Sequence, residues 1–240
     1  RGHDAAGRRR RVASGAARPT QETAMSLPDP TPDSTVLVTG ASAGIGAELG
    51  RQLAGRGYNV VLVARRADRL EELAEELRAR HGVTAQARPC DLADRAARQD
   101  LVDELLAADA QVAGVCNNAG FSTLGRFQDL EPARELEETE LNVVALQHIT
   151  AAFLPGMIDR GAGAILNVGS IAGFQPLPRQ ATYSATKAFV NAFSEAVHTD
   201  LAGTGVSCTV LCPGPVKTEF ADVAGFGKIG DFPAGVEIIS

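Results

Sequence analysis

From residue 35 onward, short runs of β-branched and apolar residues alternate with longer stretches in which apolar residues recur at helical spacing. The short runs predict strands at 35–38, 58–63, 83–88, 114–116, 164–168 and 206–211. The longer stretches predict helices at 44–56, 67–80, 93–108, 132–160 and 181–202. Repeated strand-helix units make a parallel sheet with helices on both faces, because parallel neighbours need right-handed crossovers. We therefore expect one doubly wound α/β domain over residues 35–240.

Composition is that of an average soluble globular protein. Of 240 residues, 45% are hydrophobic and 22% charged, which is enough to bury a full core. Asp and Glu number 29 against 23 Lys and Arg, and the basic run at 8–11 lies outside the predicted domain. An acidic body is unsuited to a phosphate backbone, so we expect no nucleic-acid partner.

The first 34 residues have the composition of a disordered extension. Pro28, Pro30 and Pro32 block regular structure, and Met25 is the expected natural start. The longest clear apolar run, 60–64, falls far short of the ~18 residues of a membrane span, so none is expected. The four cysteines lie in or beside apolar runs, which favours a reducing, cytoplasmic location.

The first predicted strand ends in a glycine-rich turn that opens a helix. Glycines there let the backbone approach a pyrophosphate, whose charge the N–H groups at the helix N-terminus can meet. The same pattern alone would also suit a plain strand-helix turn. Its place in the first strand-helix unit favours a dinucleotide site. The residues expected to form that site are Gly40, Ser42, Ala43, Gly44, Ile45 and Gly46.

Thr39 followed by Gly-x-x-x-Gly-x-Gly resembles the nucleotide-binding turn of the short-chain dehydrogenase/reductase family. Further motifs of that family follow in order: Asp91-Leu92, Asn117-Asn118-Ala119-Gly120, Asn142, Ser170, Tyr183-x-x-x-Lys187, and Pro213-Gly214 with Thr218. The resemblance covers about residues 36 to 220 and implies a Rossmann fold that binds NAD(H) or NADP(H). It also implies that Asn117 ties neighbouring strands together. The further cofactor contacts that it implies are Asp91, Leu92, Asn118, Ala119, Gly120, Tyr183, Lys187, Pro213, Gly214, Val216 and Thr218.

The choice of cofactor follows from charge after the second predicted strand. An acid there would bind the ribose hydroxyls of NAD(H), whereas a cation would bind the 2′-phosphate of NADP(H). The sequence has Arg65 and Arg66 and no acid before Asp68. We therefore expect NADP(H), with Arg65 as the phosphate ligand and Arg66 as support, while NAD(H) stays possible. The alternative is that both arginines are merely solvated.

Tyr183 and Lys187 are four residues apart in a predicted helix and so share a face. Alone, they could be an exposed aromatic residue and a solvated lysine. Carbonyl reduction, however, needs a proton donor, and an ammonium beside the positive nicotinamide would lower the phenol pKa from about 10. Tyr183 is therefore assigned as general acid in reduction and base in oxidation, with Lys187 as its electrostatic partner.

Two further polar residues complete the predicted catalytic set. Ser170 would donate a hydrogen bond to the substrate oxygen. By the resemblance, Asn142 would hold a water that connects the lysine to solvent, although it could instead be a core amide that bends a helix. The histidines lack the spacing of a zinc site, so no metal is expected.

These residues predict an NADP(H)-dependent oxidoreductase that interconverts a small carbonyl compound and a secondary alcohol. One alternative is a non-catalytic nucleotide-binding or scaffold protein on the same fold. Another is a nucleotide-sugar epimerase or dehydratase, but that would need a larger C-terminal domain. The resemblance further implies a homodimer or homotetramer joined through helices 132–160 and 181–202. An apolar substrate pocket could be formed by Phe121, Phe174, Leu177 and Phe220.

The C-terminal stretch departs from the family pattern. A loop that covers the substrate is expected from about residue 213, followed in the family by a helix and an edge strand. Residues 221–240 are instead rich in glycine and end in Val236-Glu237-Ile238-Ile239. We expect that the last helix and edge strand are missing or divergent.

Overall fold

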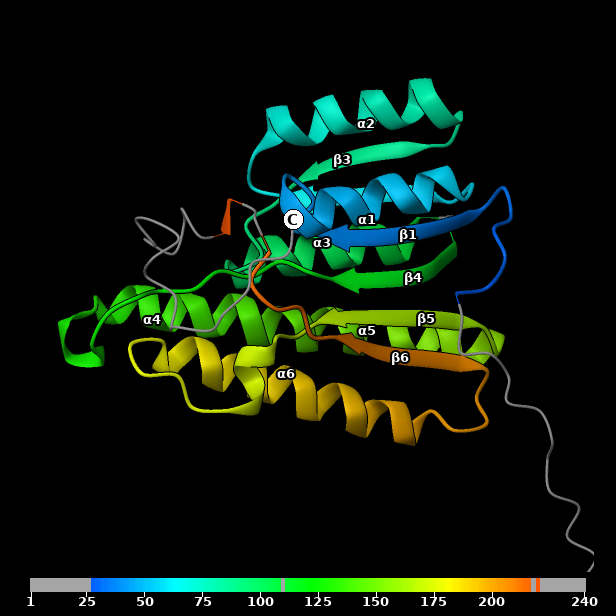
Figure 1. Ribbon diagram of the computed structural model, residues 1–240. Coiled ribbons are helices and arrows are strands. Elements are labelled where there is room, and N and C mark those ends of the chain that lie inside the picture. Colours follow the sequence, from blue (N-terminus) through cyan, green and yellow to red (C-terminus); the bar gives the residue numbers. More distant parts are fainter. Residues whose placement is uncertain (1–26, 109–110, 217–218, 221–240) are drawn as a thin grey trace, which may run out of the picture.

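The computed structural model describes residues 27–108, 111–216 and 219–220, and within them six strands form one sheet. All neighbouring strands are parallel, in the order β3-β2-β1-β4-β5-β6 (Figure 1). The strands are β1 (Ser34–Thr39), β2 (Asn59–Ala64), β3 (Ala85–Pro89), β4 (Gln111–Asn117), β5 (Gly163–Val168) and β6 (Val206–Leu211). The order reverses between β1 and β4, which is where ligands of doubly wound sheets bind.

Helices cover both faces of the sheet. They are α1 (Gly44–Gly55), α2 (Ala67–His81), α3 (Arg95–Ala107), α4 (Pro132–Thr139), α5 (Leu146–Arg160) and α6 (Ala181–Asp200). Successive side chains of a strand point to opposite faces, and β1 accordingly contributes Val36 and Val38 to one buried cluster and Leu37 to another. The first cluster includes α1 and α2, and the second includes α3 and α5.

The expected helix over 132–160 is interrupted in the structure. A π-helical segment, Glu140–Ala145, separates α4 from α5. Such segments often occur at functional sites, and this one carries Asn142. By length and composition alone, the continuous stretch Pro132–Arg160 could cross a membrane. That is weak evidence, because core helices of soluble proteins meet the same criterion, and α5 packs against β4 and β5.

The predicted strands and helices are confirmed, and their ends differ by at most a few residues. Of the extension expected to be disordered over residues 1–34, residues 27–34 are described, and Ser34 already belongs to β1. Tyr58 donates a hydrogen bond to the carbonyl of Pro28 (2.5 Å), and Asn59 donates one to that of Pro32 (2.7 Å). Met25, with the rest of residues 1–26, and the stretch 221–240 lie outside the described residues.

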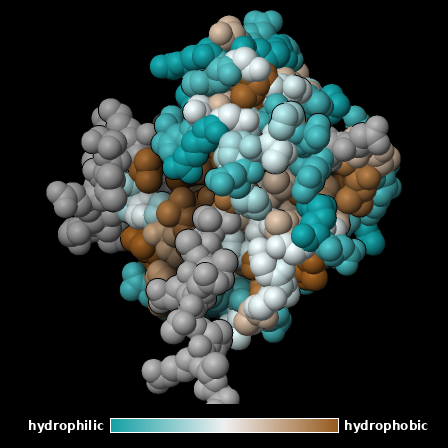
Figure 2. Space-filling view, turned by 90° about the vertical axis from the view of Figure 1, so that its right-hand side faces the viewer, coloured by the Kyte–Doolittle hydropathy of each residue, from teal (hydrophilic) through white to brown (hydrophobic). Residues whose placement is uncertain are grey.

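The loops that carry the predicted site residues lie at one end of the sheet (Figure 1). Figure 2 presents the end where the strands begin, with hydrophilic residues over much of it and a gathering of hydrophobic residues left of centre. At the opposite end lie the carboxyl ends of all the strands and the loops that follow them (Figure 1). The chemistry-bearing residues predicted from the sequence belong to that second end.

Candidate active site

Thr39, the last residue of β1, fixes the loop that follows β4. Its hydroxyl oxygen accepts hydrogen bonds from the backbone N–H groups of Asn118 and Ala119, both at 3.0 Å. In return, the Asn118 side chain donates to the carbonyl oxygens of Thr39 (2.9 Å) and Gly40 (3.2 Å). These bonds hold the glycine turn and the loop after β4 against each other at the switch point.

The three glycines of the turn are at positions where a side chain would be strained or would clash. Gly40 and Gly44 have φ of +67° and +56°, in the left-handed region that favours glycine. A Cβ on Gly46 would lie closer than 3.0 Å to both the Gly40 carbonyl and the Asn118 amide. Gly44, the first residue of α1, is exposed and lines the cavity, as an anion-binding helix terminus requires.

A single cavity of about 860 Å³ runs from the glycine turn to Tyr183 and Lys187. Its size is within the range of small-molecule and cofactor sites. Most of the predicted site residues line it, namely Gly40, Ser42, Ala43, Gly44, Ile45, Arg65, Asp91, Leu92, Asn118, Ala119, Gly120, Ser170, Tyr183, Lys187, Pro213, Gly214 and Val216. Two others do not, because Gly46 packs beneath the turn and Asn142 is buried behind the cavity. Thr218 lies outside the described residues.

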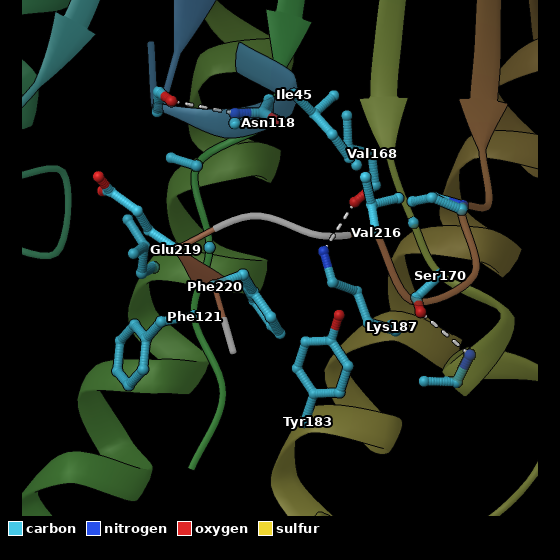
Figure 3. Close-up of a pocket in the computed structure, with 18 of the residues that line it drawn as sticks. Ile45, Asn118, Phe121, Val168, Ser170, Tyr183, Lys187, Val216, Glu219 and Phe220 are labelled. Atoms are coloured by element: carbon cyan, nitrogen blue, oxygen red, sulfur yellow. Dashed lines mark hydrogen bonds between the residues drawn. The ribbon is translucent and has the colours of Figure 1, made fainter. Parts of the chain in front are cut away.

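Tyr183 and Lys187 lie on the same face of α6, as their spacing predicts, and both are buried. The Lys187 amine is 5.7 Å from the centre of the Tyr183 ring and donates a hydrogen bond to the carbonyl of Val168 (2.7 Å). Figure 3 shows the Tyr183 hydroxyl pointing toward that amine, with Ser170 nearby on the loop after β5. The three predicted side chains therefore meet at one place.

Burial shifts the pKa values of Tyr183 and Lys187 so that the neutral form of each is favoured. It raises the pKa of Tyr183 to about 12, although hydrogen bonding from the Ser170 side chain opposes this. It lowers the pKa of Lys187 to about 8, against the attraction of the Glu138 carboxylate. Desolvation dominates the shift at Tyr183, so the lowering of its pKa by the ammonium and the nicotinamide stays a prediction for the protein with bound cofactor.

Asn142 is tied to backbone rather than aimed into the cavity. Its amide exchanges two hydrogen bonds with Phe121, at 3.1 Å and 2.9 Å, and donates one to the Thr186 hydroxyl (3.2 Å). It still lies next to the lysine, since a Cβ on Gly120 would be 2.9 Å from its oxygen and 3.7 Å from the Lys187 amine. Both sequence interpretations of Asn142 therefore remain compatible with its position.

The two arginines after β2 both line the cavity. Arg65 forms a long ion pair with Glu137 (3.5 Å), whereas Arg66 binds the Ser42 hydroxyl of the glycine turn (3.0 Å) and Glu219 (2.7 Å). The cavity thus has cations at the end where a 2′-phosphate would be recognised. At the same end, the Leu92 carbonyl accepts a hydrogen bond from the buried Arg98 (2.5 Å).

The prediction of an apolar pocket was wrong for one of its four residues, Phe174. Phe121, Leu177 and Phe220 line the cavity, and the Phe220 ring lies 5.5 Å from that of Tyr183. Phe174 does not line it and is 67% exposed, because its short 3-10 helix turns the side chain outward.

Sequence reasoning missed Arg179, which lines the same cavity. It is the sole non-glycine residue with positive φ (+69°) among the described residues. Neither its type nor its neighbours signalled this conformation. Asn117, by contrast, binds Asn167 of β5 and so ties neighbouring strands together as expected (2.9 Å). The described part of the chain contains no group of three His, Cys, Asp or Glu residues able to hold a metal.

Comparison with known proteins gives consistent matches. The family model described as short chain dehydrogenase matches residues 34–225. The chain is 41% identical to sulfoacetaldehyde reductase 2 of Chromohalobacter salexigens, over 77% of this chain and 73% of that protein. It is 40% identical to the NADP-dependent 3-hydroxy acid dehydrogenase YdfG of Escherichia coli K12, over 81% and 78%. A short-chain dehydrogenase of Sphingobium yanoikuyae solved with NADPH superposes with a TM-score of 0.80 at 35% identity, over 85% and 79%.

Proposed function

Because this chain belongs to the short-chain dehydrogenase family, we propose that it is an NADP(H)-dependent oxidoreductase that interconverts a carbonyl compound and an alcohol. The observation that carries the proposal is the shared cavity, which joins the glycine turn to Ser170, Tyr183 and Lys187. A non-catalytic nucleotide-binding protein would have no need of these three side chains around one point.

The residues around the cavity fit the cofactor. The backbone at Gly40 and Gly44 would bind the pyrophosphate, and Arg65 and Arg66 the 2′-phosphate, while Asp91 and Leu92 would enclose the adenine. Asn118, Ala119 and Gly120 would lie along the ribose, with Pro213, Gly214 and Val216 beyond it. When bound, the cofactor supplies or accepts the hydride.

The chain itself moves the proton. In reduction, Tyr183 donates its hydroxyl proton to the oxygen that gains negative charge, and Ser170 donates a hydrogen bond to the same oxygen. Lys187 places a positive charge beside the tyrosine and lowers the cost of forming tyrosinate, an effect that the oxidised nicotinamide would reinforce. Asn142, held beside Lys187, would position a water that carries the proton toward solvent.

For the substrate, we propose a small carbonyl compound with an anionic group. Arg179 lines the cavity, and its side chain forms no ion pair or hydrogen bond within the described residues. The named relatives act on sulfoacetaldehyde and on 3-hydroxy acids. Phe121, Leu177 and Phe220 would enclose the remaining, apolar part. The loop from about residue 213, which includes Phe220, would cover it.

Assembly and location are further parts of the proposal. We propose a homodimer or homotetramer in the cytoplasm, joined through the helical stretch 132–160 and α6. The outward sides of these helices carry exposed apolar residues, among them Val144, Ile158 and Phe189. Large exposed apolar surface of this kind favours a protein partner.

The decisive test compares the wild type with Tyr183→Phe. We expect NADPH-dependent reduction of a carbonyl panel that contains sulfoacetaldehyde and an uncharged ketone, with kcat reduced at least about 100-fold in the variant. NADPH affinity, followed by fluorescence, should change little. Equal turnover by both proteins would remove Tyr183 from its role and with it the mechanism.

A further inference from the structure

Two glutamates on α4 are buried together beneath the substrate side of the cavity. Glu135 is 7% exposed and Glu138 is fully buried. Both reach the same residue of the loop after β4: the Thr123 hydroxyl lies 2.5 Å from Glu135 Oε1 and 3.0 Å from Glu138 Oε2. Glu138 Oε2 also accepts from the Thr123 backbone N–H (2.9 Å). The Thr182 hydroxyl donates to the second oxygen of Glu135.

These contacts cannot all be satisfied by two carboxylates. The Thr123 hydroxyl has one proton and can donate to only one of them. Within the described residues, moreover, Glu138 Oε1 is buried without a hydrogen-bond partner. A buried, unpaired charged oxygen is costly, whereas a protonated carboxyl on Glu138 could donate to the Thr123 oxygen while Thr123 donates to Glu135. The geometry therefore favours one proton shared by the pair.

The surroundings of Glu138 act in the same direction. Burial raises the pKa of Glu138 to about 7, and the negative charge of Glu135 adds to the rise. Hydrogen bonds from Thr123 and the positive charge of Arg134 oppose it. From α6, Tyr183 and Lys187 are the titratable groups that face it, and the negative charge of Glu138 raises the pKa of each.

The acid pair connects the two sides of the substrate cleft. Thr123 stands between Phe121 and Leu124, which both line the cavity. Thr182 immediately precedes Tyr183 on α6. The pair thus holds the loop on one side of the cavity and the start of the tyrosine helix on the other.

We propose that Glu138 is a positioning residue. It shares a proton with Glu135 through Thr123, holds the 121–125 loop against α4, from which Glu135 reaches Thr182 of α6, and adds its charge to the field at Tyr183 and Lys187 when that proton leaves. This inference rests on the proposed function for its catalytic part. Its structural part, the shared proton, stands on the contacts of Thr123 alone.

The catalytic part is tested with Glu138→Gln, which keeps the shape and an acceptor for the Thr123 N–H but carries no charge. Below about pH 6 Glu138 is protonated in the wild type, so kcat/KM for carbonyl reduction should agree within about twofold. Above about pH 8 the variant lacks a charge that keeps Tyr183 and Lys187 protonated, and its alkaline limb should move to lower pH by about half a unit or more. A ratio of kcat/KM that is the same at every pH would overturn this part.

A matched control is Glu131→Gln, which removes an equal charge from the exposed residue before α4 and should leave the profile unchanged. Should Glu138→Gln fail to fold, Thr123→Val removes only the shared hydroxyl. We expect kcat/KM to fall about tenfold while NADPH affinity stays within about twofold. An unaffected kcat/KM would overturn the positioning of the loop.

The shared proton has a test that needs no turnover. A carboxyl whose pKa is raised by folding gives stability at low pH that is lost as pH rises through the folded value, here about 7. Glu138→Gln has no such loss. Its Tm relative to wild type should therefore rise by about 4 °C or more between about pH 5 and pH 8. A Tm difference between variant and wild type that does not change with pH would overturn the shared proton. Full activity of Tyr183→Phe would instead overturn the proposed function and leave the Tm result standing.

Discussion

Gly46 and Asn118 are in close contact although 72 positions separate them in the sequence. Any side chain at 46 would approach the Asn118 amide closer than 3.0 Å, and that amide already binds the carbonyls of Thr39 and Gly40. The start of α1 can therefore pack closely against the loop after β4 because Gly46 has no side chain. Position 46 acts on the nucleotide end of the cavity without lining it.

Gly46→Ala should weaken NADPH binding by about tenfold or more, because an overpacked contact costs about 1–3 kcal/mol and must displace α1 or Asn118. Gly55→Ala on the same helix is the control, since the nearest atom to its new Cβ is a His81 ring carbon at 3.5 Å. Fluorescence titration of both variants measures the difference. NADPH affinity that is unchanged in Gly46→Ala would contradict the role given to this contact.

The fold could be predicted from the sequence because its signals are local. Each strand is a short β-branched run, and each strand-helix turn has its own residues, such as Gly40 or Asn118. Tyr183 and Lys187 were predicted to share a face because their spacing alone requires it. For these elements, the spacing of residues along the chain was enough to predict which of them lie together in the fold.

What the sequence could not provide depends on packing between distant segments. The left-handed Arg179 and the outward Phe174 are set by the loop between β5 and α6, whose conformation no local pattern encodes. The burial of Glu135 and Glu138 depends on such packing as well. They are buried because Thr123 and Thr182, from other elements, supply their hydrogen bonds.

Arg98 should be a major contributor to stability. Its guanidinium is buried and binds the Leu92 carbonyl, Glu140 (2.9 Å) and a ring nitrogen of His148 (3.0 Å). Arg98→Met removes these charge-assisted bonds, and we expect the free energy of unfolding to fall by about 2–4 kcal/mol. Because Leu92 borders the adenine end, KM for NADPH should rise as well.

The exposed ion pair of Arg51 and Glu76 provides the comparison for Arg98. Arg51→Met should cost no more than about 1 kcal/mol, because solvent screens such pairs. Urea unfolding of the two variants gives both values. Equal losses would show that the burial of Arg98 has no energetic importance.

Thiol modification can locate the cofactor without an activity assay. Burial raises the pKa of Cys116 to about 12 and that of Cys208 to about 11, so both stay protonated and unreactive at about pH 8.5. Cys90 is half-buried and lines the cavity, whereas Cys212 is half-buried but does not line it. Peptide mapping after alkylation should show that NADPH protects Cys90 and leaves Cys212 unchanged. Protection of neither would place the cofactor elsewhere.

Arg179→Gln tests the anionic substrate. Loss of a charge-assisted bond to a sulfonate or carboxylate should raise KM about tenfold or more for sulfoacetaldehyde or a 3-hydroxy acid. KM for an uncharged ketone should stay at its wild-type value. Arg126→Gln is the control, because Arg126 is exposed and lies outside the main cavity. Equal KM increases for charged and uncharged substrates would attribute the effect to loop strain instead.

Cofactor choice should depend on Arg65 more than on Arg66. Among the residues that the structure describes, Arg65 is held only by a long, solvent-exposed contact with Glu137, so its guanidinium is available to a 2′-phosphate. Arg66 is already engaged by Ser42 and Glu219. Arg65→Asp should therefore raise KM for NADPH by about 10- to 100-fold and change KM for NADH little, since only NADPH has the phosphate that the new carboxylate repels.

The matched control for Arg65 is Arg69→Asp, an equal charge change on α2 at a residue that does not line the cavity. It should leave the ratio of the two KM values near that of the wild type. Arg66→Asp completes the set and should have a smaller effect on this ratio than Arg65→Asp. If the order of the two arginines is reversed, the phosphate is bound from the glycine turn, because Arg66 is the arginine that touches Ser42.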